Sequence, residues 1–119
     1  MAPANRRRFA RFPFSGRVHL YSSGAVFETD LVDLSLRGAL VRRPEAFTGK
    51  TGFHYRMELR LHGNLMIAMG VVVAHLEERQ LGLRCERLDF DSFVHLKRLV
   101  ELNLGDVRSL NRELAALDR

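Results

Sequence analysis

Residues 53–76 read FHYRMELRLHGNLMIAMGVVVAHL, and this stretch decides the fold. In residues 53–61, apolar and charged side chains alternate from Met57 to Leu61, as in a β-strand with one side facing water. Residues 65–76 follow a short polar turn and are apolar on both sides, which predicts a central strand that is covered on its outer side. The stretch therefore predicts two successive strands with no helix between them.

Further strand-like runs lie on both sides of this stretch. The predicted strands are 17–21, 26–32, 39–42, 53–61, 65–76 and 80–86. The turn signals between them are Ser22-Ser23-Gly24, Leu36-Arg37-Gly38, Thr48-Gly49-Lys50 and His62-Gly63-Asn64. A run of short strands without intervening helices favours an antiparallel sheet that closes into a small, six-stranded barrel.

From Asp91 the apolar period becomes helical. The first predicted helix begins with Asp91 or Ser92 as its N-cap and ends at Gly105. Its apolar stripe comprises Phe93, Leu96, Leu99, Val100 and Asn103. A second helix is expected after Asp106, with a stripe of Val107, Leu110, Leu114 and Leu117. Both helices are amphipathic, so they are expected to pack on the barrel or on a partner, and this C-terminal part of the chain is expected to supply the cover of residues 65–76.

The net charge of the chain lies at its N-terminal end. The 119 residues carry a formal charge of +5. The first acidic residue is Glu28, and the basic residues before it are Arg6, Arg7, Arg8, Arg11 and Arg17. The length fits a single domain, in which we expect a flexible basic arm at 1–16, a barrel at 17–90 and helices at 91–119. An arm with this charge is suited to an anionic partner.

Several classes of function find no support in the sequence. The single cysteine, Cys85, alternates with apolar residues and is expected in the core, and one cysteine makes neither an intramolecular disulfide nor a Cys-based zinc cluster, which fits a reducing cytoplasm. Membrane insertion and secretion are not expected, because long apolar runs and a signal-peptide pattern are missing. The histidines are scattered, so no metal site is expected, and no catalytic motif is found.

Two spacings carry candidate chemistry: Arg7-x-x-x-Arg11 and Asp33-x-Ser35-x-x-Gly38. An aspartate can accept hydrogen bonds from guanine N1 and N2, while an arginine can bridge guanine O6 and N7 or neutralise a phosphate. Ser35 offers a hydroxyl, and a glycine at position 38 permits close backbone approach. The structural alternative is a turn between two strands in which the aspartate and glycine serve the backbone only.

In this order, the two motifs resemble the PilZ domain, a bacterial receptor for cyclic di-GMP, and the resemblance covers nearly the whole chain. It implies a PilZ-type barrel with extended C-terminal helices, no enzymatic activity, and a monomer that signals to a downstream protein. It also implies a set of ligand-binding residues: Arg6, Arg7, Arg8, Arg11, Asp33, Ser35, Gly38 and His75. His75 stands where family members often have a tryptophan beside the purine.

Other functions remain open on the sequence. A small barrel with a basic, phenylalanine-bearing arm could bind single-stranded nucleic acid, although residues 28–119 are balanced in charge and contain no tryptophan. A flavin-dependent split-barrel enzyme would be yellow when purified, and we expect a colourless protein. PilZ-like chains that act only in protein interactions generally lack the arginine motif, which this chain retains.

Overall fold

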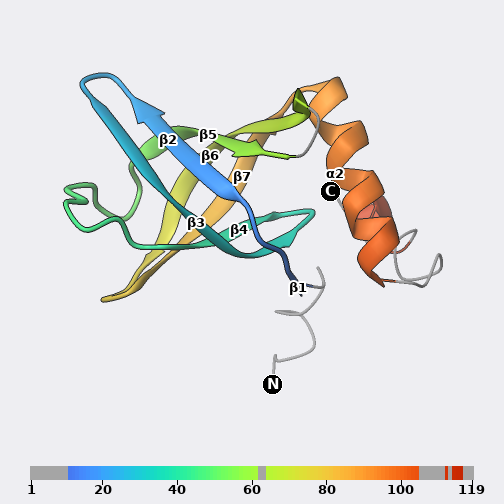
Figure 1. Ribbon diagram of the computed structural model, residues 1–119, viewed down its shortest axis with the longest axis horizontal. Coiled ribbons are helices and arrows are strands. Elements are labelled where there is room, and N and C mark those ends of the chain that lie inside the picture. The colour runs from blue at the N-terminus through green and yellow to red at the C-terminus, as the bar shows by residue number, and fades with distance from the viewer. Residues whose placement is uncertain (1–10, 62–63, 105–111, 113, 117–119) are drawn as a thin grey trace.

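The structure, a computed structural model, describes residues 11–61, 64–104, 112 and 114–116. These residues form a seven-stranded antiparallel sheet and a long helix near the C-terminus (Figure 1). The strands are β1 (Phe12–Pro13), β2 (Arg17–Ser22), β3 (Ala25–Ser35), β4 (Gly38–Arg42), β5 (His54–Arg60), β6 (Met66–Leu76) and β7 (Gln80–Leu88), and the helix is α2 (Phe90–Leu104).

Six of these strands close into a barrel. They follow the order β3-β2-β5-β6-β7-β4, and β4 pairs again with β3, so the sheet has no free edge along this circuit. Every pairing is antiparallel. The prediction of a six-stranded antiparallel barrel is therefore confirmed, and each predicted strand is found with its ends shifted by three residues or fewer.

The seventh strand, β1, was not predicted. Phe12 pairs with Leu34 and Pro13 with Asp33, which adds a short piece of the expected arm to β3, beyond the residues of β3 that pair with β2. Phe12 is buried, and its ring meets that of Phe14 edge to face at a centroid distance of 6.3 Å. Burial of these rings attaches the end of the arm to the barrel.

The core lies inside the barrel, where alternate side chains of each strand meet. Because successive residues of a strand point to opposite sides, one set of side chains faces the barrel interior and the other faces outward, where part of β6 is covered as well. The largest fully buried side chains are Val18, Leu20, Leu34, Val41, Met57, Leu59, Ile67, Met69, Val71, Val73, Leu81 and Leu96. Leu96 belongs to α2, as does Val100, which is also fully buried, so the helix completes a core that is made mainly by strands.

Helix α2 covers the first part of β6, as predicted. The Ser92 hydroxyl accepts a hydrogen bond from the Ala68 backbone N–H at 2.9 Å, and both residues are buried. One turn apart, Leu96 and Val100 reach into the core. Figure 1 shows α2 standing beside one end of the barrel, close to β1, which it contacts. The helix thus touches both the central strand and the end of the arm.

The predicted start of this helix was wrong. Asp89, and neither Asp91 nor Ser92, is the N-cap, because Asp89 Oδ1 accepts the Ser92 backbone N–H at 2.8 Å. Asn103, placed on the buried stripe by its spacing, is exposed and donates to the Leu99 carbonyl at 2.7 Å. Ser92 takes a buried position instead, since its hydroxyl is used by β6.

Parts of the sequence analysis fall on residues that the structure does not describe. These include the flexibility of the arm over residues 1–10, the helix stop at Gly105 and the cap at Asp106. Of the second predicted helix, Arg112 and residues 114–116 are helical, and Leu114 packs against the core. In the described ranges, α2 is too short and too polar to cross a membrane, and no other helix qualifies.

Candidate ligand-binding face

Strand pairing brings Asp33 and His75 to one outer face of the barrel. Asp33 pairs with Leu40, Leu40 with Gly82, and Gly82 with His75, which gives a row across β3, β4, β7 and β6. Directly paired residues point to the same side of a sheet. Leu40 and Asp33 are partly exposed and His75 is exposed, so the row faces outward. Two candidates that lie 42 positions apart in sequence thus flank one apolar floor.

Gly82 leaves room for the His75 side chain in this row. A Cβ atom at Gly82 would lie 3.2 Å from both Cβ and Cδ2 of His75. The imidazole therefore leans across the glycine toward β4. A larger residue at position 82 would displace it.

A second row lies next to the first and contains the rest of the barrel motif. Ser35 pairs with Gly38, Gly38 with Arg84, and Arg84 with Val72. The Arg84 side chain is 55% exposed and stands beside the motif glycine. The sequence analysis did not propose Arg84. The sequence did contain a signal for this position. Leu81, Leu83 and Cys85 alternate and face inward, so residue 84 must face outward.

Ser35 and Gly38 shape the turn between β3 and β4. The Arg37 backbone N–H donates to Ser35 Oγ at 3.1 Å, and this hydroxyl donates weakly to the Gly38 carbonyl at 3.5 Å. Strand β3 runs on to Ser35, three residues beyond its predicted end at residue 32. At Gly38 a Cβ atom would collide with the Leu83 carbonyl oxygen of β7. Gly38 therefore lets the β4 backbone pass close to β7, and the Ser35 hydroxyl has a structural role in the turn.

Arg11 lies against Asp33. Arg11 Nε is 3.7 Å from Asp33 Oδ1, with 60% of the arginine side chain exposed and 20% of the aspartate. Because Pro13 pairs with Asp33, strand β1 holds Arg11 near this carboxylate. One arginine of the first motif and the aspartate of the second are thus brought together. Arg6, Arg7 and Arg8 lie outside the described residues.

The sequence also matches a known protein family. The model of the PilZ domain family matches residues 5–102, which is most of the chain and includes both motifs. The chain belongs to the PilZ domain family. The resemblance to the PilZ domain that the two motifs indicated is therefore confirmed.

Several solved structures share this fold. The inhibitor of motility MotI/DgrA of Bacillus subtilis superimposes with a TM-score of 0.71 at 17% identity, over 85% of this chain and 52% of that one. The PilZ domain of YcgR from Escherichia coli, solved with c-di-GMP, gives a TM-score of 0.71 at 15% identity, over 87% of this chain and 95% of that one. YcgR from Escherichia coli in complex with c-di-GMP gives a TM-score of 0.67 at 17% identity, over 96% of this chain and 51% of that one. This chain thus spans about half of MotI/DgrA and of that YcgR chain, but nearly all of the isolated PilZ domain.

The charges on this PilZ domain face suit an anion rather than a metal ion. Arg11 lies on it beside Asp33, Arg84 lies on it with an exposed ion pair to Glu86 at 3.5 Å, and no group of three or more metal-ligating side chains is found among the described residues. Burial raises the pKa of Asp33 above its usual value of 3.8, and the nearby Arg11 charge lowers it in part. The carboxylate is therefore partly desolvated, so a donor that reaches it meets a strong acceptor.

We expect this pKa to rise further in the Arg11→Ala variant, because the variant removes the favourable charge and leaves the burial. Because the pKa of Asp33 is higher in the folded chain than in the unfolded chain, the protonated carboxyl stabilises the fold relative to the ionised one. This stability is fully present below the unfolded-state pKa and is lost as the pH rises through the folded-state pKa. Carboxyl ¹³C shifts followed by NMR from pH 2 to 7 would measure it. Glu28 is an internal contrast, because its hydrogen bond and ion pair with Arg17 lower its pKa. An unchanged Asp33 pKa in the variant would mean that Arg11 does not act on it.

Proposed function

We propose that this PilZ domain is a cyclic di-GMP receptor and that it binds the dinucleotide on the outer face of β3, β4, β7 and β6. The observation that carries the proposal is the placement of Arg11 against Asp33, with Arg84 and His75 on the same face. Cyclic di-GMP carries guanine donors and phosphates, and this face offers an acceptor carboxylate beside guanidinium groups.

Each residue has a chemical role in this proposal. Asp33 accepts hydrogen bonds from guanine N1 and N2, and Arg11 moves from the carboxylate to guanine O6 and N7 or to a phosphate. Arg84 neutralises a phosphate beside Gly38. The imidazole of His75 packs against a purine over the floor made by Leu40 and Gly82, with less stacked area than an indole would give.

Three further arginines, Arg6, Arg7 and Arg8, complete the site in this proposal. Arg7 is the other motif arginine and Arg6 and Arg8 flank it. They add phosphate contacts, because the forked guanidinium group suits phosphate oxygens. Cyclic di-GMP would order the arm over the barrel, at a cost in conformational entropy that the charge-assisted hydrogen bonds offset.

The change would reach the helix through β1. Arg11 directly precedes β1, and β1 contacts both β3 and α2. A ligand that draws Arg11 away from Asp33 therefore acts on a strand that touches the C-terminal helix. We propose that the resulting change of surface signals to a downstream protein in the cytoplasm and that the domain has no catalytic role.

Isothermal titration calorimetry of the full chain with cyclic di-GMP tests the function. We expect saturable binding with one or two nucleotides per chain, and much weaker binding of GMP, because GMP presents a single guanine and cannot bridge both rows. A mixed single-stranded oligonucleotide should not compete at physiological salt. No heat with cyclic di-GMP, together with oligonucleotide binding that falls steeply with salt, would replace this proposal by the nucleic-acid alternative.

A further inference from the structure

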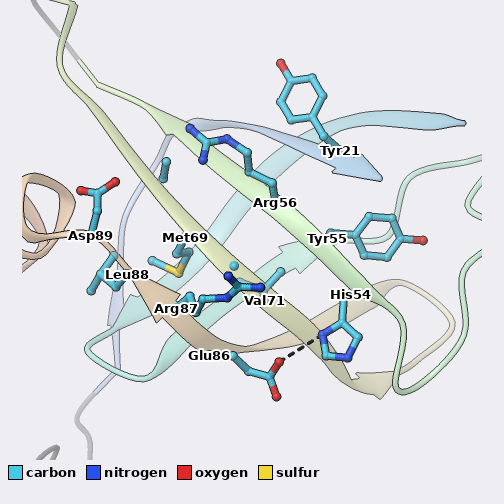
Figure 2. A pocket seen from close by; sticks show the side chains of 12 residues that line it. Tyr21, His54, Tyr55, Arg56, Met69, Val71, Glu86, Arg87, Leu88 and Asp89 are labelled. Carbon is cyan, nitrogen blue, oxygen red and sulfur yellow. Dashed lines mark ion pairs between the residues drawn. The ribbon is translucent and has the colours of Figure 1, made fainter. Parts of the chain in front are cut away.

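A second row of outward residues lies on another face of the barrel. Tyr21 pairs with Arg56, Arg56 with Gly70, and Gly70 with Arg87, across β2, β5, β6 and β7. A hollow of about 630 Å³ lies over this row. Figure 2 shows Arg56, Arg87 and Tyr21 around it, with the start of α2 at Asp89 on one side. We call this the Gly70 hollow.

The missing side chain of Gly70 makes the hollow. Neighbouring strands lie about 4.8 Å apart, so the backbones of Arg56 and Arg87 are separated by roughly 10 Å with only a glycine between them. An arginine side chain is long enough for both guanidinium groups to reach one group above Gly70. A Cβ atom at Gly70 would lie 3.3 Å from Cβ of Arg87, which is closer than ordinary contact.

The acidic residues around the Gly70 hollow are already engaged. Glu86 pairs with His54 at 3.1 Å and with Arg84 at 3.5 Å. Asp89 caps α2. By contrast, the Arg87 guanidinium makes no hydrogen bond or ion pair to any residue that the structure describes. Arg87 is exposed, so its N–H groups are available to an anionic acceptor.

Arg56 has one partner and shares it. Glu58 accepts from Arg56 Nε at 3.1 Å and from Arg60 at 3.3 Å. Both contacts lie at the surface, where such pairs contribute less than about 1 kcal/mol. Arg56 is therefore free to turn its remaining N–H groups toward a ligand. Together, the two arginines give the hollow a preference for an anionic group.

An apolar patch continues the hollow onto the helix. Phe90 follows Asp89 directly and is 77% exposed, and Val94, one turn later, is 45% exposed. Exposed aromatic residues next to arginine and tyrosine are typical of protein-binding surfaces, where these types contribute most of the affinity. The surface therefore combines anion recognition with an apolar contact.

We propose that the Gly70 hollow and this patch bind an acidic and apolar segment of a partner protein. A carboxylate of the partner inserts above Gly70 between Arg56 and Arg87, and an adjacent apolar side chain packs on Phe90 and Val94. The existence of a partner rests on the proposed signalling function, but the chemistry of this surface does not require cyclic di-GMP.

An NMR titration of the full chain with the capped peptide Gly-Asp-Leu-Glu-Phe-Gly tests the proposal. We expect saturable amide shifts centred on Tyr21, Arg56, Gly70, Arg87 and Phe90. The peptide Gly-Asn-Leu-Gln-Phe-Gly should bind at least about fivefold more weakly, because it loses the charge-assisted hydrogen bonds. Arg87→Gln and Arg56→Gln should each cause a similar loss. Arg79→Gln, which removes the same charge from the turn between β6 and β7, should cause none.

The remaining outcomes are decisive. Shifts that do not saturate, shifts centred elsewhere, or equal binding of the two peptides would overturn the inference. A second titration with cyclic di-GMP separates it from the proposed function. If the peptide binds and cyclic di-GMP does not, only the receptor function fails, whereas the reverse result removes only this surface.

Discussion

The Asp33→Ala variant is expected to bind cyclic di-GMP about 10- to 100-fold more weakly than the wild type, because hydrogen bonds to a charged group contribute about 1.5–3 kcal/mol. The carboxylate is the acidic side chain that stands next to Arg11, and it accepts from both donors of a guanine edge in the proposed complex. Calorimetry at one fixed salt concentration measures the change. The variant should fold normally, since it replaces a carboxylate whose ionised form is disfavoured by burial.

Asp30→Ala is the matched control. Asp30 lies three residues away on the same strand, is exposed, and pairs with Arg17 at 2.9 Å. This variant changes the net charge by the same amount, so general electrostatic attraction of the ligand is altered equally. Equal loss in the two variants would show that charge alone acts, and an unchanged affinity of Asp33→Ala would remove Asp33 from the site.

The strands could be predicted because alternation and turns are local signals. Met57 and Leu59 are buried as their period requires, and the long apolar β6 lies centrally under α2. The ends of elements were less predictable. The helix is capped by Asp89, and the Ser92 hydroxyl is used by the Ala68 N–H, a contact between residues 24 positions apart.

The full candidate face could not be predicted, because it depends on register. The pairing of Asp33 with Leu40 follows a bulge in the pairing of β3 with β4, and His75 meets Gly82 only after a bulge between Val73 and His75. A shift of one residue would turn either side chain to the other side of the sheet. The motif residues were found from their types and spacing. The position of Arg84 beside Gly38 and the Gly70 hollow emerge only when the strands are paired.

The motif glycine, Gly38, serves the fold as well as the proposed site. Strand β4 begins at Gly38, which pairs with Arg84 of β7. An added Cβ would collide with the Leu83 carbonyl oxygen, which is backbone and cannot swing aside as a side chain would. The two strands would therefore have to separate where the barrel closes.

Gly38→Ala is expected to lower the free energy of unfolding by about 3 kcal/mol, at the upper end for overpacking a tight site. Urea denaturation followed by circular dichroism measures this. Gly24→Ala is the control: Gly24 has a φ of 86° and nothing within 4 Å of an added Cβ, so only backbone strain of about 1 kcal/mol applies. If Gly38→Ala were as stable as the wild type yet failed to bind cyclic di-GMP, Gly38 would serve the ligand and not the closure of the barrel. Loss of stability alone, with affinity retained in the folded fraction, would assign it to the fold.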